Sequence, residues 1–484
     1  MQNNKSIKKN FIMNTMLSMS SFIFPLITFP YVSRILLPDG TGRVSFATSV
    51  ITYFNMFAQL GIPTYGVREC AKVRDNRKEL TRVSQELLLI NLVMSVFSYT
   101  ALFISIALVP KFRSQRTLLL IISSTILLNA IGMEWLYRAL EEYTYITIRS
   151  IIFKFIALVA MFLLIHQKSD YIIYGGITIF AAAASYIFNF INAHKFIDMR
   201  PVGSYNWKRH MKPILVFFAM SCATTIYTNL DTIMLGFMKT DEDVGYYNAA
   251  VKIKNVLVSV VTSLGTVLLP RASYYVEHKQ MEEFRGISKK ALNFVCILAV
   301  PLMVYFTFFG REGVLLLSGP AYEGSILPMQ ILMPTILFIG ITNILGIQIL
   351  VPIGREIVVL QSEIAGAVTD LILNAIFIPR LASAGAAIGT LVAEFVVLLV
   401  QYHALKNDIT SIFTSIGYWK IILGAVLGSI CCLWVKALSY GNFQKLLIAA
   451  VIFFPVYGII LTVTKEPLAI EIAQQLLSKV RRKK

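Results

Sequence analysis

The stretch Ser21-Phe22-Ile23-Phe24-Pro25-Leu26-Ile27-Thr28-Phe29-Pro30-Tyr31-Val32-Ser33-Arg34 is apolar and carries no charge before its last residue. It is the first of about fourteen apolar spans, which follow one another through short polar segments. Apolar runs of about twenty residues fit the roughly 30 Å hydrocarbon core of a bilayer at about 1.5 Å per helical residue. The sequence therefore predicts an all-α polytopic membrane protein with about 14 transmembrane helices and no water-soluble domain.

The composition agrees with this class. Of the 484 residues, 56% are hydrophobic and only 14% are charged, and the mean hydropathy is +0.69. A soluble globular domain has fewer apolar and more charged residues. A β-barrel would show alternating residues over about ten positions, and no such alternation dominates here.

The positive charge follows the pattern of a membrane protein. The formal net charge of +18 would suggest nucleic acid in a soluble protein, but most Lys and Arg residues lie in segments that follow even-numbered spans. That bias is the positive-inside rule for cytoplasmic loops. We therefore expect no nucleic-acid partner and predict that both termini and the loop at 67–86 are cytoplasmic. Lys111, Arg113 and Arg116 fit least well, because this topology places them outside.

An internal repeat is visible when residues 1–205 are laid over residues 206–405. Matching segments are Arg34-Ile35-Leu36-Leu37 with Asp231-Thr232-Ile233-Met234, Leu60-Gly61 with Leu264-Gly265, and Asn129-Ala130-Ile131-Gly132 with Asn343-Ile344-Leu345-Gly346. Because each half has an even number of spans, we expect a rotation about the membrane normal to relate them, as in transporters with a site at the repeat interface. The predicted divisions are two six-helix repeats, 1–205 and 206–405, and two additional helices with a basic cytoplasmic tail at 406–484.

Polar side chains recur at helical spacing in the first two spans of each half. Asn55 belongs to such a stripe in the second span, and Lys252 and Asn255 belong to one in the eighth. Small polar residues often pack helix against helix, so any single stripe is equally well a packing surface. Stripes at equivalent positions of two repeats favour a shared aqueous cavity.

Ionisable residues inside apolar spans are costly and often functional. The spans contain Arg34, Lys154, Asp231, Lys252, Lys254, Glu363, Asp370 and Glu394. For Lys154, Lys254 and Glu394 we favour a structural role, in which the charged group pairs with a neighbouring helix or extends to the membrane interface. Glu363 and Asp370 share one helical face with Asn374, so they are candidates for ion coupling, and a plain salt bridge is an equal alternative.

Other patterns indicate packing. Glu134 and Arg138 form an i, i+4 pair, which is usually a modest structural contact. Gly385 and Gly389, like Gly424 and Gly428, are spaced for close helix approach rather than activity.

The sequence contains no nucleotide-binding GxxxxGK[ST] loop, no HExxH and no GxSxG motif, and its five histidines lie at span ends or in loops. We therefore expect a protein that is not an enzyme, with no catalytic residues, cofactor or metal. The five cysteines form no CxxC pair.

Three segments resemble one known family. They are Phe29-Pro30-Tyr31-Val32-Ser33-Arg34 with Gly40-Thr41-Gly42, Leu60-Gly61-Ile62-Pro63 with Gly66-Val67-Arg68-Glu69, and Asn229-Leu230-Asp231-Thr232-Ile233-Met234 with Gly245-Tyr246-Tyr247-Asn248. The chain resembles the Wzx-type polysaccharide transporters, the flippases for capsule and O-antigen repeat units in the multidrug/oligosaccharidyl-lipid/polysaccharide exporter superfamily. The resemblance implies movement of a polyprenyl-pyrophosphate-linked oligosaccharide from the inner to the outer leaflet of a bacterial cell membrane by alternating access.

The implied cargo gives the charges a role. Its pyrophosphate is an anion that needs cations on a path of low dielectric. We expect Arg34, Asp231, Lys252, Asn255 and Asn55 to bind substrate, with Asp231 paired to Arg34 or Lys252 in the empty carrier and displaced by phosphate. The expected partners are the lipid-linked glycan and membrane lipids, with a polysaccharide polymerase as a further candidate.

Two other functions remain open on the sequence alone. One is a cation-coupled exporter of drugs or of a lipid-linked peptidoglycan precursor; basic residues in the first span would favour the precursor, but that span is uncharged before Arg34. The other is a membrane-embedded polymerase, ligase or glycosyltransferase. Such an enzyme usually needs a sizeable loop outside the membrane, and no loop of that size is evident.

Overall fold

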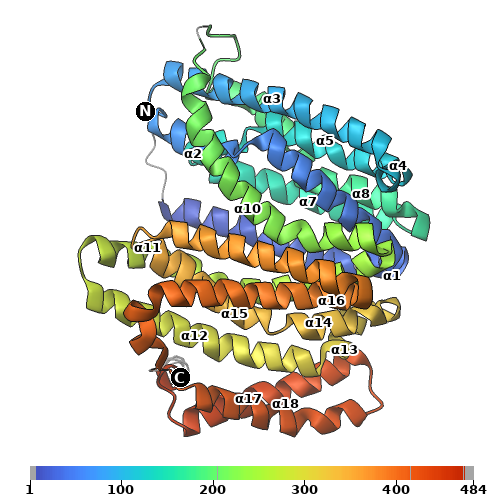
Figure 1. The fold of residues 1–484 in the computed structure, drawn as a ribbon, viewed down its shortest axis with the longest axis vertical. Helices are drawn as coiled ribbons and strands as arrows, with labels where there is room; N and C mark the ends of the chain where they lie inside the picture. The colour runs from blue at the N-terminus through green and yellow to red at the C-terminus, as the bar shows by residue number, and fades with distance from the viewer. Residues whose placement is uncertain (1–6, 204, 415, 472–473, 475–484) are drawn as a thin grey trace, which may run out of the picture. The chain divides into compact units, whose positions relative to one another are not determined.

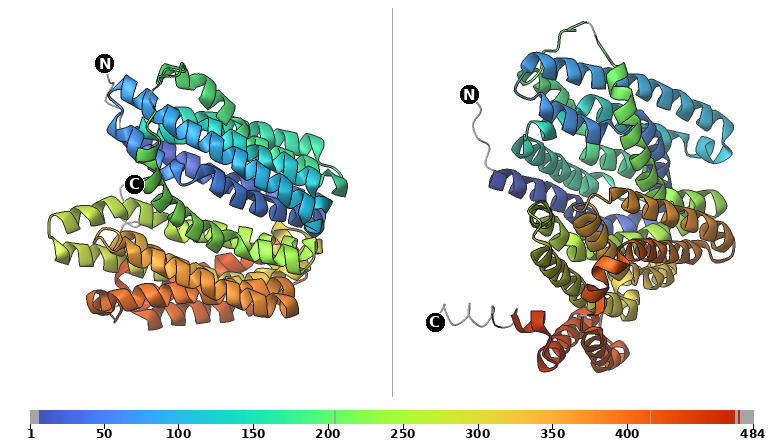
Figure 2. Two further views of the ribbon diagram at one scale, coloured as in Figure 1. Left: turned by 45° about the horizontal axis from the view of Figure 1, so that its top comes forward. Right: turned by 60° about the vertical axis from the view of Figure 1, so that its left-hand side comes forward.

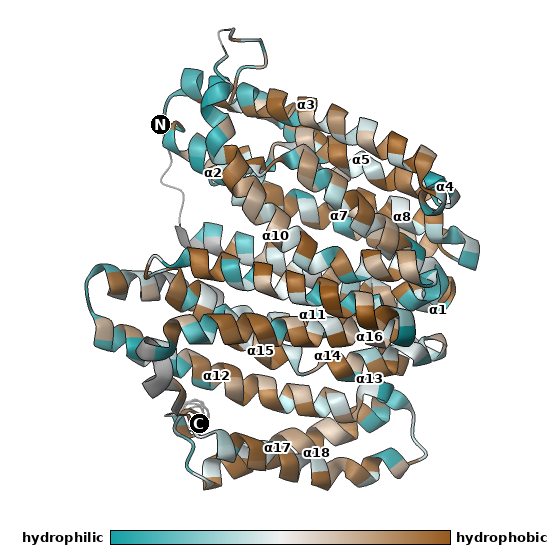
Figure 3. Cartoon of the chain, viewed as in Figure 1, coloured by the Kyte–Doolittle hydropathy of each residue, from teal (hydrophilic) through white to brown (hydrophobic). Residues whose placement is uncertain are grey.

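The structure is a computed structural model that describes residues 7–203, 205–414, 416–471 and 474. Within these residues every element is a helix, which confirms the all-α prediction. Apolar residues make up most of the middles of the long helices, and polar residues are more frequent toward their ends (Figure 3). Most of the predicted basic tail and the predicted N-terminal end lie outside the described residues.

Two helices are much longer than a membrane requires. α1 (Ile7–Gln59) has 53 residues and α16 (Glu356–Thr414) has 59. Straight helices of this length would reach about 80 Å or more, far beyond a hydrocarbon core of roughly 30 Å. Each is broken by one residue with positive φ, Leu37 at 58° and Ala382 at 48°. Each therefore covers two of the predicted spans.

The number of membrane crossings stays a prediction. Among the described residues, nine helices are long and apolar enough to cross, or ten if the bent pair Pro320–Leu332 and Thr335–Leu350 is one span. This tally treats α16 as one helix and leaves out α5 (Arg116–Gly132) as too short. Helical residues occupy all the predicted ranges, which begin at about 11, 43, 87, 117, 148, 171, 212, 245, 290, 326, 357, 384, 419 and 444.

The first of two compact units ends at Gly245. In it α1 packs against α3 (Arg77–Leu108), α5, α7 (Tyr143–Leu164) and α10 (Lys208–Met238). The remaining helices are α2 (Ile62–Lys72), α4 (Pro110–Ser114), α6 (Glu134–Ala139), α8 (Tyr171–Ile179), a π-helical turn (Phe180–Ala184) and α9 (Tyr186–Asn192). A buried cluster that includes Cys70, Leu87, Trp135 and Ile214 joins α2, α3, α6 and α10.

The second unit begins at Tyr246, within α11 (Asp241–Glu277). It continues through α12 (Met281–Phe308), α13 (Gly310–Leu317), α14 (Ile326–Leu332), α15 (Thr335–Asn343), a π-helical segment (Ile344–Leu350), α16, α17 (Tyr418–Cys432) and α18 (Asn442–Val463). α17 and α18 form an antiparallel pair, drawn in red in the right view of Figure 2.

Both glycine pairs lie at close helix contacts, as predicted. A Cβ on Gly424 would lie 2.9 Å from the Tyr457 ring, and one on Gly428 would lie 3.0 Å from the Phe453 ring. A Cβ on Gly385 would lie 2.5 Å from the backbone of Phe377, across the break in α16. The repeat boundaries at 205 and 405 rest on the sequence and stay a prediction, while the contact boundary after Gly245 groups α10 with the first unit.

Candidate functional site

The residues predicted to bind substrate are divided between the two units. Arg34 is exposed on α1 and donates to the Pro30 carbonyl, and Asp231 is buried on α10, with 6% exposure. Asn55 is half-buried on α1 and accepts a hydrogen bond from Asn129 Nδ2 at 3.1 Å. In the second unit, Lys252 is half-buried and Asn255 is exposed on α11. The predicted pairing of Asp231 with Arg34 or Lys252 stays a proposal.

The acidic stripe of α16 lies partly inside a helix contact. Asp370 and Asn374 are buried, whereas Glu363 is half-buried. A Cβ on Gly389, beyond the break in α16, would lie 2.9 Å from Asp370 Oδ1 and 2.4 Å from Asn374 Oδ1. Only a glycine therefore leaves room for these polar groups, and their role in ion coupling stays a proposal.

A charged cluster in the first unit was not foreseen as a whole. We call Glu134, Arg138, Arg149, Lys154 and Tyr186 the Glu134 cluster. Met133, at φ 43°, ends α5, so that Glu134 begins α6. Glu134 Oε1 accepts from Arg138 Nε at 3.0 Å and Nη2 at 2.6 Å, which confirms the predicted pair.

The pairing of Glu134 with Arg138 changes the pKa of the arginine. Burial opposes the charge on Arg138, but attraction to the Glu134 carboxylate outweighs it and raises the pKa of the guanidinium. The second oxygen of Glu134 lies 3.7 Å from Nη2 of Arg149. Glu134 therefore joins a residue at the end of α6 to one inside α7.

Arg149 is the unusual member of the cluster. Its side chain is 7% exposed and lies over the rings of Tyr186 and Tyr145, at 5.2 and 5.9 Å from the ring centroids. Its Nε and Nη1 atoms are buried and have no hydrogen-bond partner within the described chain. Because an unsatisfied buried polar group costs about 1–3 kcal/mol, this guanidinium is suited to receive an additional acceptor.

Lys154 extends the cluster toward α1. Its Nζ donates to Ser20 Oγ at 2.8 Å and to Ser21 Oγ at 3.0 Å. These hydrogen bonds agree with the structural pairing expected for Lys154. Hydroxyl groups solvate an ammonium without neutralising it. Arg138, Arg149 and Lys154 together exceed the charge of Glu134, so the cluster suits an anion, and guanidinium groups bind phosphate oxygens in pairs.

Only a weak signal for this cluster is visible in the sequence. Arg149 is at the edge of the predicted span 148–166, where a cation is ordinary, and Arg138 lies outside any span. The spacing between Arg149 and Lys154 does not identify Glu134 as a neighbour, because that residue is on another helix. The available signal was the presence of two cations five residues apart, Arg149 and Lys154, at the start of one predicted span.

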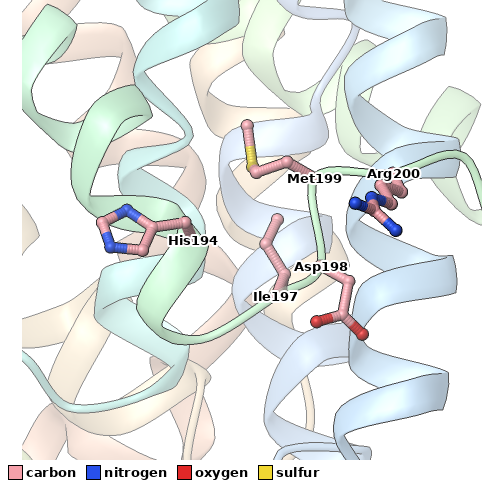
Figure 4. Close-up of a pocket in the computed structure, with 5 residues that line it drawn as sticks. All are labelled: His194, Ile197, Asp198, Met199 and Arg200. Carbon is pink, nitrogen blue, oxygen red and sulfur yellow. The ribbon is translucent and has the colours of Figure 1, made fainter.

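A surface depression of about 510 Å³ lies elsewhere in the first unit, lined by His194, Ile197, Asp198, Met199 and Arg200 (Figure 4). Its Asp198 is paired with Arg77 at 3.0 Å. The depression belongs to the linker before α10 and does not include the Glu134 cluster. In the described part of the chain, no group of three or more His, Cys, Asp or Glu side chains could hold a metal.

Comparison with known proteins assigns the fold and the family. The family described as "Polysaccharide biosynthesis protein" matches residues 7–276. A protein of Escherichia coli (strain K12), named "Putative O-antigen transporter", is 24% identical over 410 residues, which cover 84% of this chain and 98% of the relative.

Two solved structures share the fold. "Lipid II flippase MurJ, inward closed conformation" has a TM-score of 0.74 at 17% identity and covers 94% of this chain and 99% of its own. A "multidrug resistance MATE family transporter of the MOP superfamily" in an inward-facing conformation has a TM-score of 0.63 at 13% identity, covering 84% and 99%. At these identities the likeness shows a shared fold alone.

Proposed function

The chain belongs to the polysaccharide biosynthesis protein family, and from this premise we propose that it is a flippase for lipid-linked oligosaccharides. The cargo is an oligosaccharide repeat unit on a polyprenyl pyrophosphate. It moves from the inner to the outer leaflet of a bacterial cell membrane by alternating access. The E. coli relative named as an O-antigen transporter supports this cargo class, and the shared fold with a lipid II flippase supports movement of a lipid-linked glycan.

The observation that carries the proposal is the Glu134 cluster. A helical bundle that handled only neutral sugar and lipid would have no use for an arginine buried with two unsatisfied N–H groups. A pyrophosphate supplies several acceptor oxygens and negative charge. It would accept from Arg149 and from Arg138 or Lys154, and Glu134 would give up part of its pairing as the anion arrives.

Residues predicted from the sequence supply further contacts along the path. Arg34 and Lys252 are proposed to hold the anion in turn, with Asp231 as the displaced counterion. Asn55 and Asn255 are proposed to bind sugar hydroxyl groups. Glu363 and Asp370 are the candidates for ion coupling.

Leaflet-resolved measurement of lipid-linked repeat units tests this function. In cells that lack the chain, untruncated units should build up on the inner leaflet, and the wild-type chain should restore surface polysaccharide. Arg149→Ala should reduce export at least about tenfold, since it removes both the charge and the paired donors. Arg149→Lys should retain part of the export, because it restores the charge alone.

A matched control separates this effect from general damage. Arg77 is also paired with a carboxylate, at 3.0 Å from Asp198, but its side chain is 54% exposed. Arg77→Ala should therefore export normally. If Arg149→Ala protein is inserted, abundant and as active as wild type, the cluster is not on the cargo path.

The alternative function is a cation-coupled exporter of drugs or of a peptidoglycan precursor, which the shared fold with a multidrug transporter supports. Hypersensitivity to dyes without build-up of repeat units would favour the drug exporter. Inner-leaflet build-up of the peptidoglycan precursor would favour the other branch, whereas monomers on the outer leaflet would indicate a polymerase.

A further inference from the structure

α10 is fastened to the first unit at both of its ends. In Figure 1 it starts beside α2 and ends near the break in α1. Its 31 residues correspond to about 46 Å of helix, so the two fastenings are at opposite ends of a long lever. They differ in chemistry, and that difference indicates how α10 moves.

The fastening at the start of α10, which we call the start lock, consists of Glu86, Arg209, His210 and Tyr65. Glu86 has no exposed side-chain surface, and its Oε2 accepts from Arg209 Nη2 and lies against His210 Nε2, both at 2.7 Å. Its Oε1 accepts from the backbone N–H of Asn206 at 2.6 Å. The other ring nitrogen of His210 lies 2.7 Å from the Tyr65 hydroxyl.

The start lock is complete as it stands. The two ring nitrogens of His210 lie within hydrogen-bond distance of Glu86 and of Tyr65, while Arg209 balances the charge of Glu86. Neighbouring Gln85 adds donations to the carbonyls of Asp198 and Arg200 at 2.7 and 2.8 Å. A buried network in which each polar group is satisfied favours one fixed arrangement.

The fastening at the far end, which we call the end latch, consists of Asp241, Lys111, Gln115 and Arg43. Asp241 Oδ1 accepts from Lys111 Nζ at 2.6 Å, and Gln115 Nε2 lies 3.2 Å from both carboxylate oxygens. Arg43 Nε lies 3.5 Å from Asp241. The Asp241 side chain is 13% exposed, whereas that of Glu86 in the start lock has no exposed surface, so water reaches the carboxylate of the latch but not that of the lock. The ion pair with Asp241 also explains why Lys111 lies on the predicted outer side, where the positive-inside rule does not favour it.

Backbones meet closely behind the end latch. A Cβ on Gly42 would lie 1.7 Å from the carbonyl oxygen of Asp241, and one on Gly245 would lie 2.1 Å from that of Pro38. A Cβ on Gly236 would lie 2.1 Å from the ring of Phe46. Small residues at these three positions let the backbones and the Phe46 ring pack closely. The latch surface is therefore held by close packing and by the ion pairs of Asp241.

We propose that α10 is a lever that stays attached to the first unit at the start lock and is released at the end latch during transport. The sequence repeat makes α10 the first span of the second half, so a helix of that half is pivoted on the first unit. The latch lies at the end predicted to face outside, where cargo would leave. This inference rests on the proposed function for its role in export, but the motion itself can be measured without cargo.

Thiol crosslinking in membranes tests the lever. The background has Cys70, Cys222, Cys296, Cys431 and Cys432 replaced by Ala or Ser, and its export is established first. One pair, Phe112→Cys with Phe237→Cys, reports the latch, since these rings are 5.5 Å apart and the latch charges are kept. The other pair, Phe57→Cys with Phe218→Cys, reports the lock side, since these rings are 5.5 Å apart and Phe218 lies in the half of α10 nearer the start lock. The crosslinker is a short reducible bis-methanethiosulfonate.

The first readout is crosslinking yield with and without Asp241→Asn. Loss of the partly exposed ion pairs should shift the latch toward its released state by about fivefold and reduce the yield of the latch pair, but not of the lock pair. Unchanged yield at the latch, or an equal fall at both ends, would overturn the lever. This readout needs no cargo.

The second readout is export. Crosslinking of the latch pair should stop export, and reduction should restore it, while crosslinking of the lock pair should leave export intact. Full export with the latch crosslinked overturns the lever. If the wild-type chain exports no lipid-linked glycan, the proposed function fails, while the crosslinking yields still decide whether the latch releases.

Discussion

Replacing Glu86 by glutamine tests how much the start lock stabilises the first unit. Both carboxylate oxygens of Glu86 accept from N–H groups, Oε1 from Asn206 and Oε2 from Arg209 and His210. Glutamine has one oxygen and one NH₂ group. Whichever way the amide is turned, its NH₂ group faces a donor.

The cost follows from this mismatch. At least one buried donor loses its acceptor, which costs about 1–3 kcal/mol. The lost attraction to Arg209 adds up to about 1 kcal/mol, because that side chain is 38% exposed and is screened by water. The total is about 2–4 kcal/mol, and a unit of this size loses roughly 2–4 °C of Tm per kcal/mol. We therefore expect Tm to fall by roughly 5–15 °C.

Thermal unfolding of the purified protein in detergent, followed by tryptophan fluorescence, measures the shift. Trp135 reports the buried cluster beside the lock, and Trp207 directly precedes α10. Glu79→Gln is the matched control, since Glu79 also pairs with an arginine, Arg82 at 2.9 Å, but is 37% exposed. It should change the free energy of unfolding by less than about 0.5 kcal/mol. If Glu86→Gln unfolds within about 2 °C of wild type, the lock contributes no such stability.

Three further predictions concern the path, the topology and the packing. Lys252→Ala and Arg34→Ala should abolish export at normal expression, and Arg34→Lys should retain some; wild-type surface polysaccharide from abundant alanine variants would make these charges structural. Lys78→Cys should resist impermeant maleimide added outside intact cells, because positive-inside topology places loop 67–86 in the cytoplasm; full labelling would reverse the orientation. Gly389→Leu should cost more than about 3 kcal/mol in unfolding free energy, since its Cβ would overlap Asn374 and bury Asp370 against carbon, whereas Gly286→Leu, with nothing within 4 Å, should be nearly neutral.

Much of the architecture could be predicted because it is local. Apolar runs fix which segments become membrane helices, and the paired glycines at 385, 389, 424 and 428 lie at close contacts, as their spacing indicated. The number of membrane crossings could not be confirmed. In α1 and α16 two predicted spans are joined at a single non-helical residue and not by a loop. Pro38 directly follows the break at Leu37, and Pro379 lies three residues before the break at Ala382, so both breaks fall in the gaps between predicted spans.

The candidate site was predicted only in part. The sequence identified the pair of Glu134 and Arg138 as a structural contact, because i, i+4 spacing is visible within one helix. It named no partner for Lys154, which donates to Ser20 and Ser21 on another helix. It did not bring Arg149 into the same cluster, since that contact joins two helices. The substrate-binding residues taken from helical stripes stay a proposal.

By itself, the sequence determined the class of protein, the helical segments and the charge bias that orients them, since each depends on residue type and short-range period. Tertiary structure decided which charges meet. Glu86 lies 124 residues from His210, and Lys111 lies 130 residues from Asp241. No short-range pattern encodes such contacts, because they depend on how whole helices pack. That packing turns scattered ionisable residues into the Glu134 cluster, the start lock and the end latch.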